Sequence, residues 1–111
     1  MKTNEEIYQY FRYLNQKVTN VRQSLADATT INWNYGLGNC AVVSISGTRI
    51  VAITGMQGVC FGVLEVKHLV AGSALTLPGD MSTVKWNNVA GMTTLLRFYF
   101  NGKSFIWSSN A

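Results

Sequence analysis

The chain has 111 residues, of which 48% are hydrophobic and 13% are charged, and its net charge is +4. This composition excludes an intrinsically disordered chain, and the length fits one domain. No apolar run reaches the roughly 18 residues that cross a bilayer, and residues 1–6 lack the apolar region of a signal peptide, so we expect no membrane insertion. The charged fraction is about half the roughly 25% usual in soluble domains, which favours burial of surface between subunits.

The first element in the chain is predicted to be a helix. Thr3 and Glu6 have the spacing of a capping box, which predicts a helix beginning at Asn4. Apolar residues then recur at alternating steps of four and three residues, the heptad pattern of a coiled-coil seam. The predicted seam consists of Ile7, Phe11, Leu14, Val18, Val21, Leu25 and Ala28. We therefore expect a coiled-coil stalk over residues 1–30.

The residue types in the seam favour a parallel trimer. Phe11 occupies one core position, β-branched residues occupy both kinds of core position, and the flanking positions lack the Glu/Lys pairs of many dimeric zippers. The alternative for the same pattern is a single amphipathic helix packed across its own sheet.

Residues 31–111 are predicted to form a β-sandwich head. Residues 31–39, which include Trp33 and Tyr35, are expected to be a connector. A hairpin is predicted around Gly47 and Thr48, and a breaker cluster follows at residues 78–80. The predicted strands are 40–46, 49–54, 59–66, 74–77, 93–100 and 103–108. The fold class is therefore mostly β, a coiled-coil stalk followed by an antiparallel sandwich.

The Asn101–Gly102 dipeptide is the strongest local turn signal, because this pair accepts the positive φ angles of a type I′ hairpin. A two-residue loop would pair Phe98 with Phe105 and Leu96 with Trp107 on one face, which we expect to be core. The opposite face would carry Arg97, Tyr99, Ser104 and Ser108.

No catalytic or metal-binding group is expected. Cys40 and Cys60 lie in apolar runs and are interpreted as buried free thiols. His68, the one histidine, is expected at the surface, and Glu65 and Asp80 do not form a carboxylate pair. The sequence therefore predicts a protein that is not an enzyme and holds no metal or cofactor.

The candidate ligand-binding residues are aromatic and amide side chains. A flat ring covers the apolar face of a pyranose, and asparagine both donates and accepts hydrogen bonds to hydroxyls. Trp86 with Asn87 and Asn88 meets this description, and Trp33 and Tyr35 are further exposed candidates. The alternative is that Trp86 belongs to the core and the two asparagines form a turn.

The C-terminal stretch resembles the closing hairpin of bacteriophage tail-fibre heads. The residues that carry the resemblance are Tyr99–Phe100–Asn101–Gly102 followed by Phe105–Ile106–Trp107–Ser108, with Leu75–Thr76–Leu77–Pro78–Gly79 upstream. The resemblance covers about the last 40 residues. It implies a trimeric, distal, receptor-binding head of a virion fibre, made in the host cytoplasm, that contacts saccharides or proteins of the bacterial surface. It supplies no binding residues.

The expected function is thus receptor binding by a homotrimeric fibre head, with further fibre or tail proteins as partners. Two alternatives remain. Lys85 beside Trp86 and Arg97 near Tyr99 also suit a module that binds single-stranded nucleic acid. A purely structural trimerisation cap of a longer fibre is the other.

Overall fold

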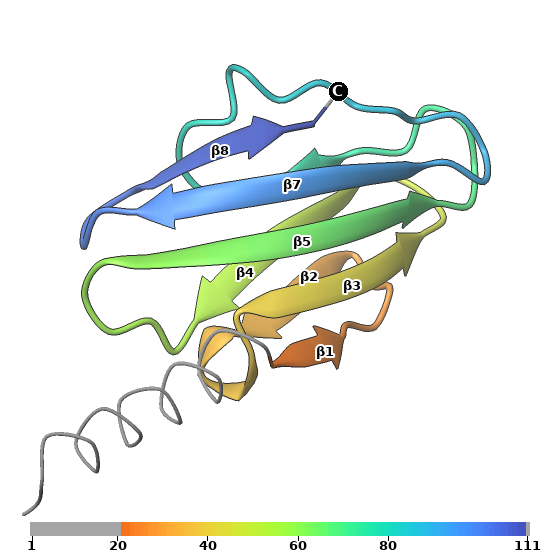
Figure 1. The fold of residues 1–111 in the computed structure, drawn as a ribbon. Coiled ribbons are helices and arrows are strands. Elements are labelled where there is room, and N and C mark those ends of the chain that lie inside the picture. Colours follow the sequence, from red (N-terminus) through yellow and green to blue (C-terminus); the bar gives the residue numbers. More distant parts are fainter. Residues whose placement is uncertain (1–20, 111) are drawn as a thin grey trace, which may run out of the picture.

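The computed structural model describes residues 21–110, which form two packed β-sheets with one short 3-10 turn (Figure 1). The five-stranded sheet has the strand order β1-β3-β5-β7-β8, and the three-stranded sheet has the order β2-β4-β6. The elements are β1 (Arg22–Ser24), β2 (Thr30–Asn34), η1 (Tyr35–Leu37), β3 (Cys40–Ile45), β4 (Arg49–Thr54), β5 (Cys60–His68), β6 (Leu75–Thr76), β7 (Thr93–Phe100) and β8 (Phe105–Ser109).

Strands β1 to β6 alternate between the two sheets. β1, β3 and β5 pair in parallel in one sheet, and β2, β4 and β6 pair in parallel in the other. The chain therefore winds as a coil that crosses from sheet to sheet and stacks each turn on the previous one, as in a solenoid. Among the described strands, only the last two pair in an antiparallel manner: β7 pairs with β5, and β8 pairs with β7.

The prediction of an antiparallel sandwich was wrong about strand pairing. The predicted hairpin at Gly47–Thr48 does not form: after this corner β4 pairs with β2 and β6, not with β3. Arg49 donates its backbone N–H to Ala74 and Ile50 donates to Thr29, at 3.0 Å each. Apolar alternation is the same in a hairpin and in a coil, because both bury one strand face, so the sequence pattern could not separate them.

The strand positions themselves were predicted well. β4 and β7 have the predicted limits, and β3 and β5 differ by one or two residues at their ends. The strand β2 was not predicted. It buries Ile31 and Trp33, but only these two residues are apolar, and the polar residues between them were interpreted as part of a connector.

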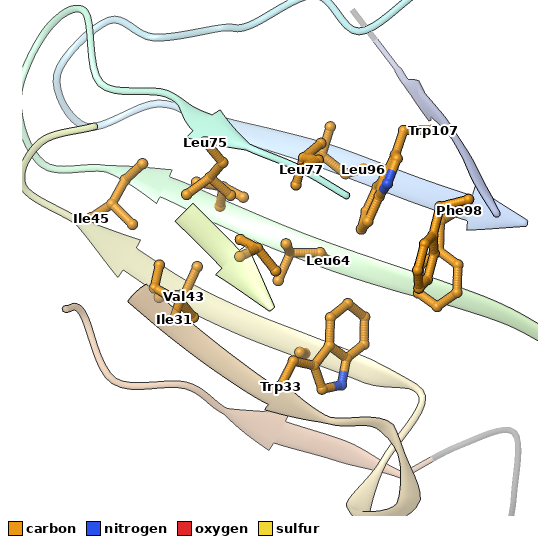
Figure 2. Packing of buried hydrophobic residues seen from close by; sticks show 14 residues of the cluster. Ile31, Trp33, Val43, Ile45, Leu64, Leu75, Leu77, Leu96, Phe98 and Trp107 are labelled. Atoms are coloured by element: carbon orange, nitrogen blue, oxygen red, sulfur yellow. The ribbon is translucent and has the colours of Figure 1, made fainter. Parts of the chain in front are cut away.

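The core lies between the two sheets and receives alternate side chains from both (Figure 2). Its aromatic part is built around Phe98, whose ring lies edge-on to Trp33 at 5.6 Å and next to Trp107 at 5.0 Å between ring centroids. Gly62 faces Phe98 directly across the β5–β7 pair, and the absence of a side chain there makes room for the ring.

The closing hairpin has the predicted faces but a different register. Leu96, Phe98, Phe105 and Trp107 are all buried, as predicted. The observed pairs, however, are Phe98 with Trp107 and Phe100 with Phe105. The loop therefore spans residues 101–104. Within it, the Asn101 side-chain oxygen accepts hydrogen bonds from the backbone N–H groups of residues 103 and 104, which stabilise the longer turn. A shift of two residues leaves every side chain on its predicted face.

The last part of the predicted stalk is not helical. Residues 22–24 form β1 in parallel with β3, so the helix predicted through Ala28 is wrong from residue 21 onward. The backbone of Val21 and Leu25 bonds to β3 residues, which makes these two seam positions part of the head. The seam residues Ile7, Phe11, Leu14 and Val18 lie outside the described residues.

Candidate functional site

The head has two ends of different character. One end, which we call the entry end, is formed by Val21 and residues 35–39, 55–60 and 101–104. The other, which we call the far end, is formed by residues 25–29, 46–48, 69–74 and 85–92. β5 runs from one end to the other, from Cys60 to His68 (Figure 1).

The entry end contains an open cleft of about 600 Å³. None of its lining residues is charged. Tyr35 forms part of one wall and donates its hydroxyl to the backbone oxygen of Phe61 at 2.7 Å. Burial raises the pKa of the Tyr35 hydroxyl and of the Cys60 thiol above their usual values, so both stay neutral at physiological pH. The cleft is lined by Val21, Tyr35, Gly36, Leu37, Gly38, Asn39, Gly55, Gln57, Val59, Cys60 and Phe61.

Trp33 packs in the core next to the entry end. It is completely buried, and its indole N–H donates to the backbone oxygen of Gly38 at 2.9 Å. The expectation that Trp33 is an exposed receptor contact was therefore wrong, because a ring in the core has no face to offer a ligand. Tyr35 is half-buried and remains available on the cleft wall.

The far end presents two loops that are bonded to each other. Gly72 donates its backbone N–H to Asn88 at 2.9 Å, and Gly91 donates to His68 at 2.7 Å. Asn87 and Asn88 are half-buried and bond to other described residues through their backbone. The same loops expose the apolar side chains of Leu69, Val70, Val89 and Met92.

Trp86 packs against the core, as one of the two alternatives predicted, and part of its side chain remains exposed. Its ring lies edge-on to His68 at 6.1 Å. Trp86, Asn87 and Asn88 thus lie together at the far end, whereas Tyr35 lies at the entry end. The structure does not bring the five predicted binding residues to one place.

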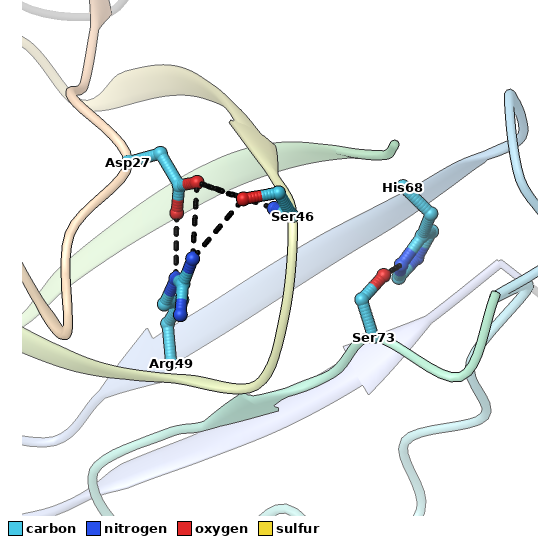
Figure 3. Close-up of polar contacts among 5 residues, drawn as sticks. All are labelled: Asp27, Ser46, Arg49, His68 and Ser73. Atoms are coloured by element: carbon cyan, nitrogen blue, oxygen red, sulfur yellow. Dashed lines mark hydrogen bonds and ion pairs between the residues drawn. The ribbon is translucent and has the colours of Figure 1, made fainter. Parts of the chain in front are cut away.

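His68 is buried, contrary to the prediction of a surface position. Its Nδ1 lies 2.7 Å from Ser73 Oγ and its Nε2 lies 2.7 Å from Thr94 Oγ1 (Figure 3 shows the first contact). Ser73 donates its own proton to the backbone oxygen of Val70, so the Ser73 hydroxyl accepts from Nδ1–H. Thr94 in turn donates to Nε2 and accepts from the backbone N–H of Asn87.

The His68 network holds the far-end loops and offers no reactive hydroxyl. The exposed fractions of His68, Ser73 and Thr94 are at most 2%, so a substrate cannot reach them. Desolvation lowers the pKa of His68, which keeps the ring neutral as this hydrogen-bond chain requires. The network could not be predicted from the sequence, because Ser73 and Thr94 lie five and 26 residues away from His68.

A second polar cluster ties two corners of the coil at the far end. The Asp27 carboxylate accepts from Arg49 Nε at 2.7 Å and from the backbone and hydroxyl of Ser46 (Figure 3). These contacts, the bond to Arg49 first, lower the pKa of Asp27 to about 2. The cluster joins the β1–β2 corner to the β3–β4 corner.

Cys40 and Cys60 are free thiols, as predicted, but both are half-buried instead of buried. Among residues 21–110, no group of three or more His, Cys, Asp or Glu side chains is placed to hold a metal ion. Within that range there is also no helix of the length and hydropathy needed to cross a membrane.

No protein-family model, curated protein or solved structure matches this chain.

Proposed function

We propose that this protein is the receptor-binding head of a trimeric fibre of the bacteriophage tail-fibre type, and that the far end contacts a saccharide on the bacterial surface. The observation that carries the proposal is the position of Trp86, Asn87 and Asn88. They lie at the end of β5 opposite to Val21, where the predicted stalk joins the head. In a fibre with its stalk at the entry end, the far end is the tip.

The far end carries amide and apolar side chains that suit a ligand rich in hydroxyl groups, together with the exposed charge of Lys85. The side-chain amides of Asn87 and Asn88 are free of hydrogen bonds to the other described residues, so they can exchange water for sugar hydroxyls. The charges of Asp27 and Arg49 compensate each other in their ion pair. Exposed Val89 and Met92 add an apolar surface for the ring carbons of a saccharide.

Trimerisation makes weak individual sites sufficient. Three identical tips on one rigid head raise the effective affinity by about 10² to 10⁴ when all can bind one surface, without any tight single contact. A membrane-spanning or enzymatic role is not part of the proposal.

The proposal is tested with the full chain on a panel of immobilised bacterial surface polysaccharides at several salt concentrations. The double variant Asn87→Ala, Asn88→Ala should reduce binding at least tenfold. Gln57→Ala in the entry-end cleft is the matched control, because it also removes one exposed amide side chain and should leave binding unchanged.

Equal binding by the double variant and the wild type would contradict the proposed site. Failure to bind any polysaccharide, with binding to single-stranded DNA that falls steeply as salt increases, would instead identify a nucleic-acid module.

A further inference from the structure

The entry end and the adjoining outer face of the five-stranded sheet carry a contiguous apolar surface, which we call the apolar band. Its members are Val21, Leu37, Val59, Phe61, Tyr99 and Ile106, with exposed fractions between 36% and 66%. An isolated exposed apolar residue needs no explanation, but a contiguous group of this size does.

The band is continuous across separate elements. Phe61, Tyr99 and Ile106 stand in one cross-strand row, because Phe61 pairs with Tyr99 and Tyr99 pairs with Ile106. The rings of Phe61 and Tyr99 touch, with centroids 5.3 Å apart. Phe61 also lines the cleft together with Val21, Leu37 and Val59, which connects the row to the entry end.

The band is somewhat smaller than one side of a standard protein interface. The exposed parts of its six side chains amount to on the order of 500 Å² of apolar area. The largest apolar patch of a typical monomer is about 300–600 Å², and each side of a standard interface buries about 800 Å². The band therefore supplies most of the apolar area that one side of a specific protein contact needs.

We infer that the apolar band packs against the heads of neighbouring copies of this chain. The inference rests on the proposed trimer, and two observations favour a second copy as the occupant. The band includes Val21, so any association of the segments that precede Val21 brings the bands of the joined heads together at high effective concentration. None of its members is charged, which suits close packing between identical, positively charged chains.

The contact also explains the charge-poor composition of the protein. A band of this size facing water would favour uncontrolled association, whereas a closed ring of three heads covers it. Because the band falls short of a standard interface area, the heads alone are expected to associate weakly, and the stalk is expected to supply the remaining stability.

The inference is tested by replacing Phe61 in the full chain with the photo-reactive p-benzoylphenylalanine and irradiating at micromolar concentration. A covalent product of two or three chains, joined from position 61 to residues of the band or sheet of another head, is expected. Products that are only intramolecular, in a sample that is trimeric by mass, would overturn the inference and leave the proposed receptor-binding function untouched.

A second measurement uses the double variant Phe61→Thr, Ile106→Thr, which places a residue of high strand propensity at two exposed strand positions and is checked for folding by circular dichroism. The concentration at which the trimer half-dissociates should rise at least tenfold. Ile50→Thr is the matched control, since Ile50 is 50% exposed on the outer face of the other sheet, and it should have no effect. If the double variant half-dissociates at the same concentration as the wild type, the head-to-head contact is contradicted. Polysaccharide binding is measured separately and tests only the receptor site.

Discussion

At the scale of residues, two side chains with polar atoms are buried although each has a polar neighbour in the sequence. Trp33 and His68 both stand next to polar residues, which favoured surface positions, yet both are completely buried. Each finds its partners across the fold, Trp33 at Gly38 and His68 at Ser73 and Thr94. Hydrogen bonds of this kind depend on tertiary placement, so the sequence alone does not reveal them.

Gly62 is required by the ring of Phe98. A Cβ at position 62 would lie 2.0 Å from the nearest atom of that ring, so Gly62→Ala forces the aromatic core apart. We expect a loss of about 1–3 kcal/mol in the free energy of unfolding, measured by urea denaturation. The double variant Gly62→Ala, Phe98→Leu should recover part of this loss. Strictly additive losses in the double variant would show that the two residues do not meet.

His68 makes stability depend on pH in the range where histidine titrates. The pKa of His68 is lowered in the folded state. Below about pH 6.5, the ordinary pKa of histidine, the unfolded chain therefore binds more protons than the folded protein does. The free energy of unfolding should therefore be constant above that pH and fall as the pH decreases below about 6.5. His68→Asn should be less stable at pH 7 and should lack this slope, since the chain has no other histidine. Parallel pH profiles of the two proteins would contradict the buried neutral ring.

At the scale of elements, the sequence predicts where strands are but not how they pair. Alternation and turn residues located β4 and β7 correctly and found the buried face of the closing hairpin. At Gly47 the coil is accompanied by contacts of Asp27 with Ser46 and Arg49, and Asp27 lies in a corner about twenty residues earlier in the chain. The binding-site prediction was limited in the same way: Trp86, Asn87 and Asn88 are adjacent in sequence and stay together, whereas Tyr35 is at the other end.

The parallel pairing of β3 with β5 places Ser44 opposite Lys67 on the outer face of the sheet. Cysteines at these two positions, with Cys40 and Cys60 replaced by alanine, should form a disulfide on mild oxidation, detected by mass spectrometry after digestion. The control pair Ser44→Cys, Thr76→Cys joins strands of different sheets and should stay reduced. A disulfide in the control but not in the test pair would contradict the observed sheet order.

At the scale of the whole molecule, the two ends of the head have separate roles in this account. The apolar band begins where the described chain begins, and the amide-bearing loops lie at the opposite end. Separate ends allow self-association and receptor binding to occur in the same particle without competition. The coiled-coil seam is the remaining component, and its residues Ile7, Phe11, Leu14 and Val18 stay a prediction.

The most direct test of the account is the absolute mass of the full chain in solution, measured by light scattering during size exclusion. One chain has a mass of 12.3 kDa, and we expect a species of three chains. The variant Leu14→Asp, Val18→Asp should elute as a folded monomer at low micromolar concentration, because charges in the seam remove the main source of association. A wild-type protein with the mass of a single chain, or a seam variant that remains trimeric, would contradict a trimeric fibre head whose stalk lies in the residues before Val21.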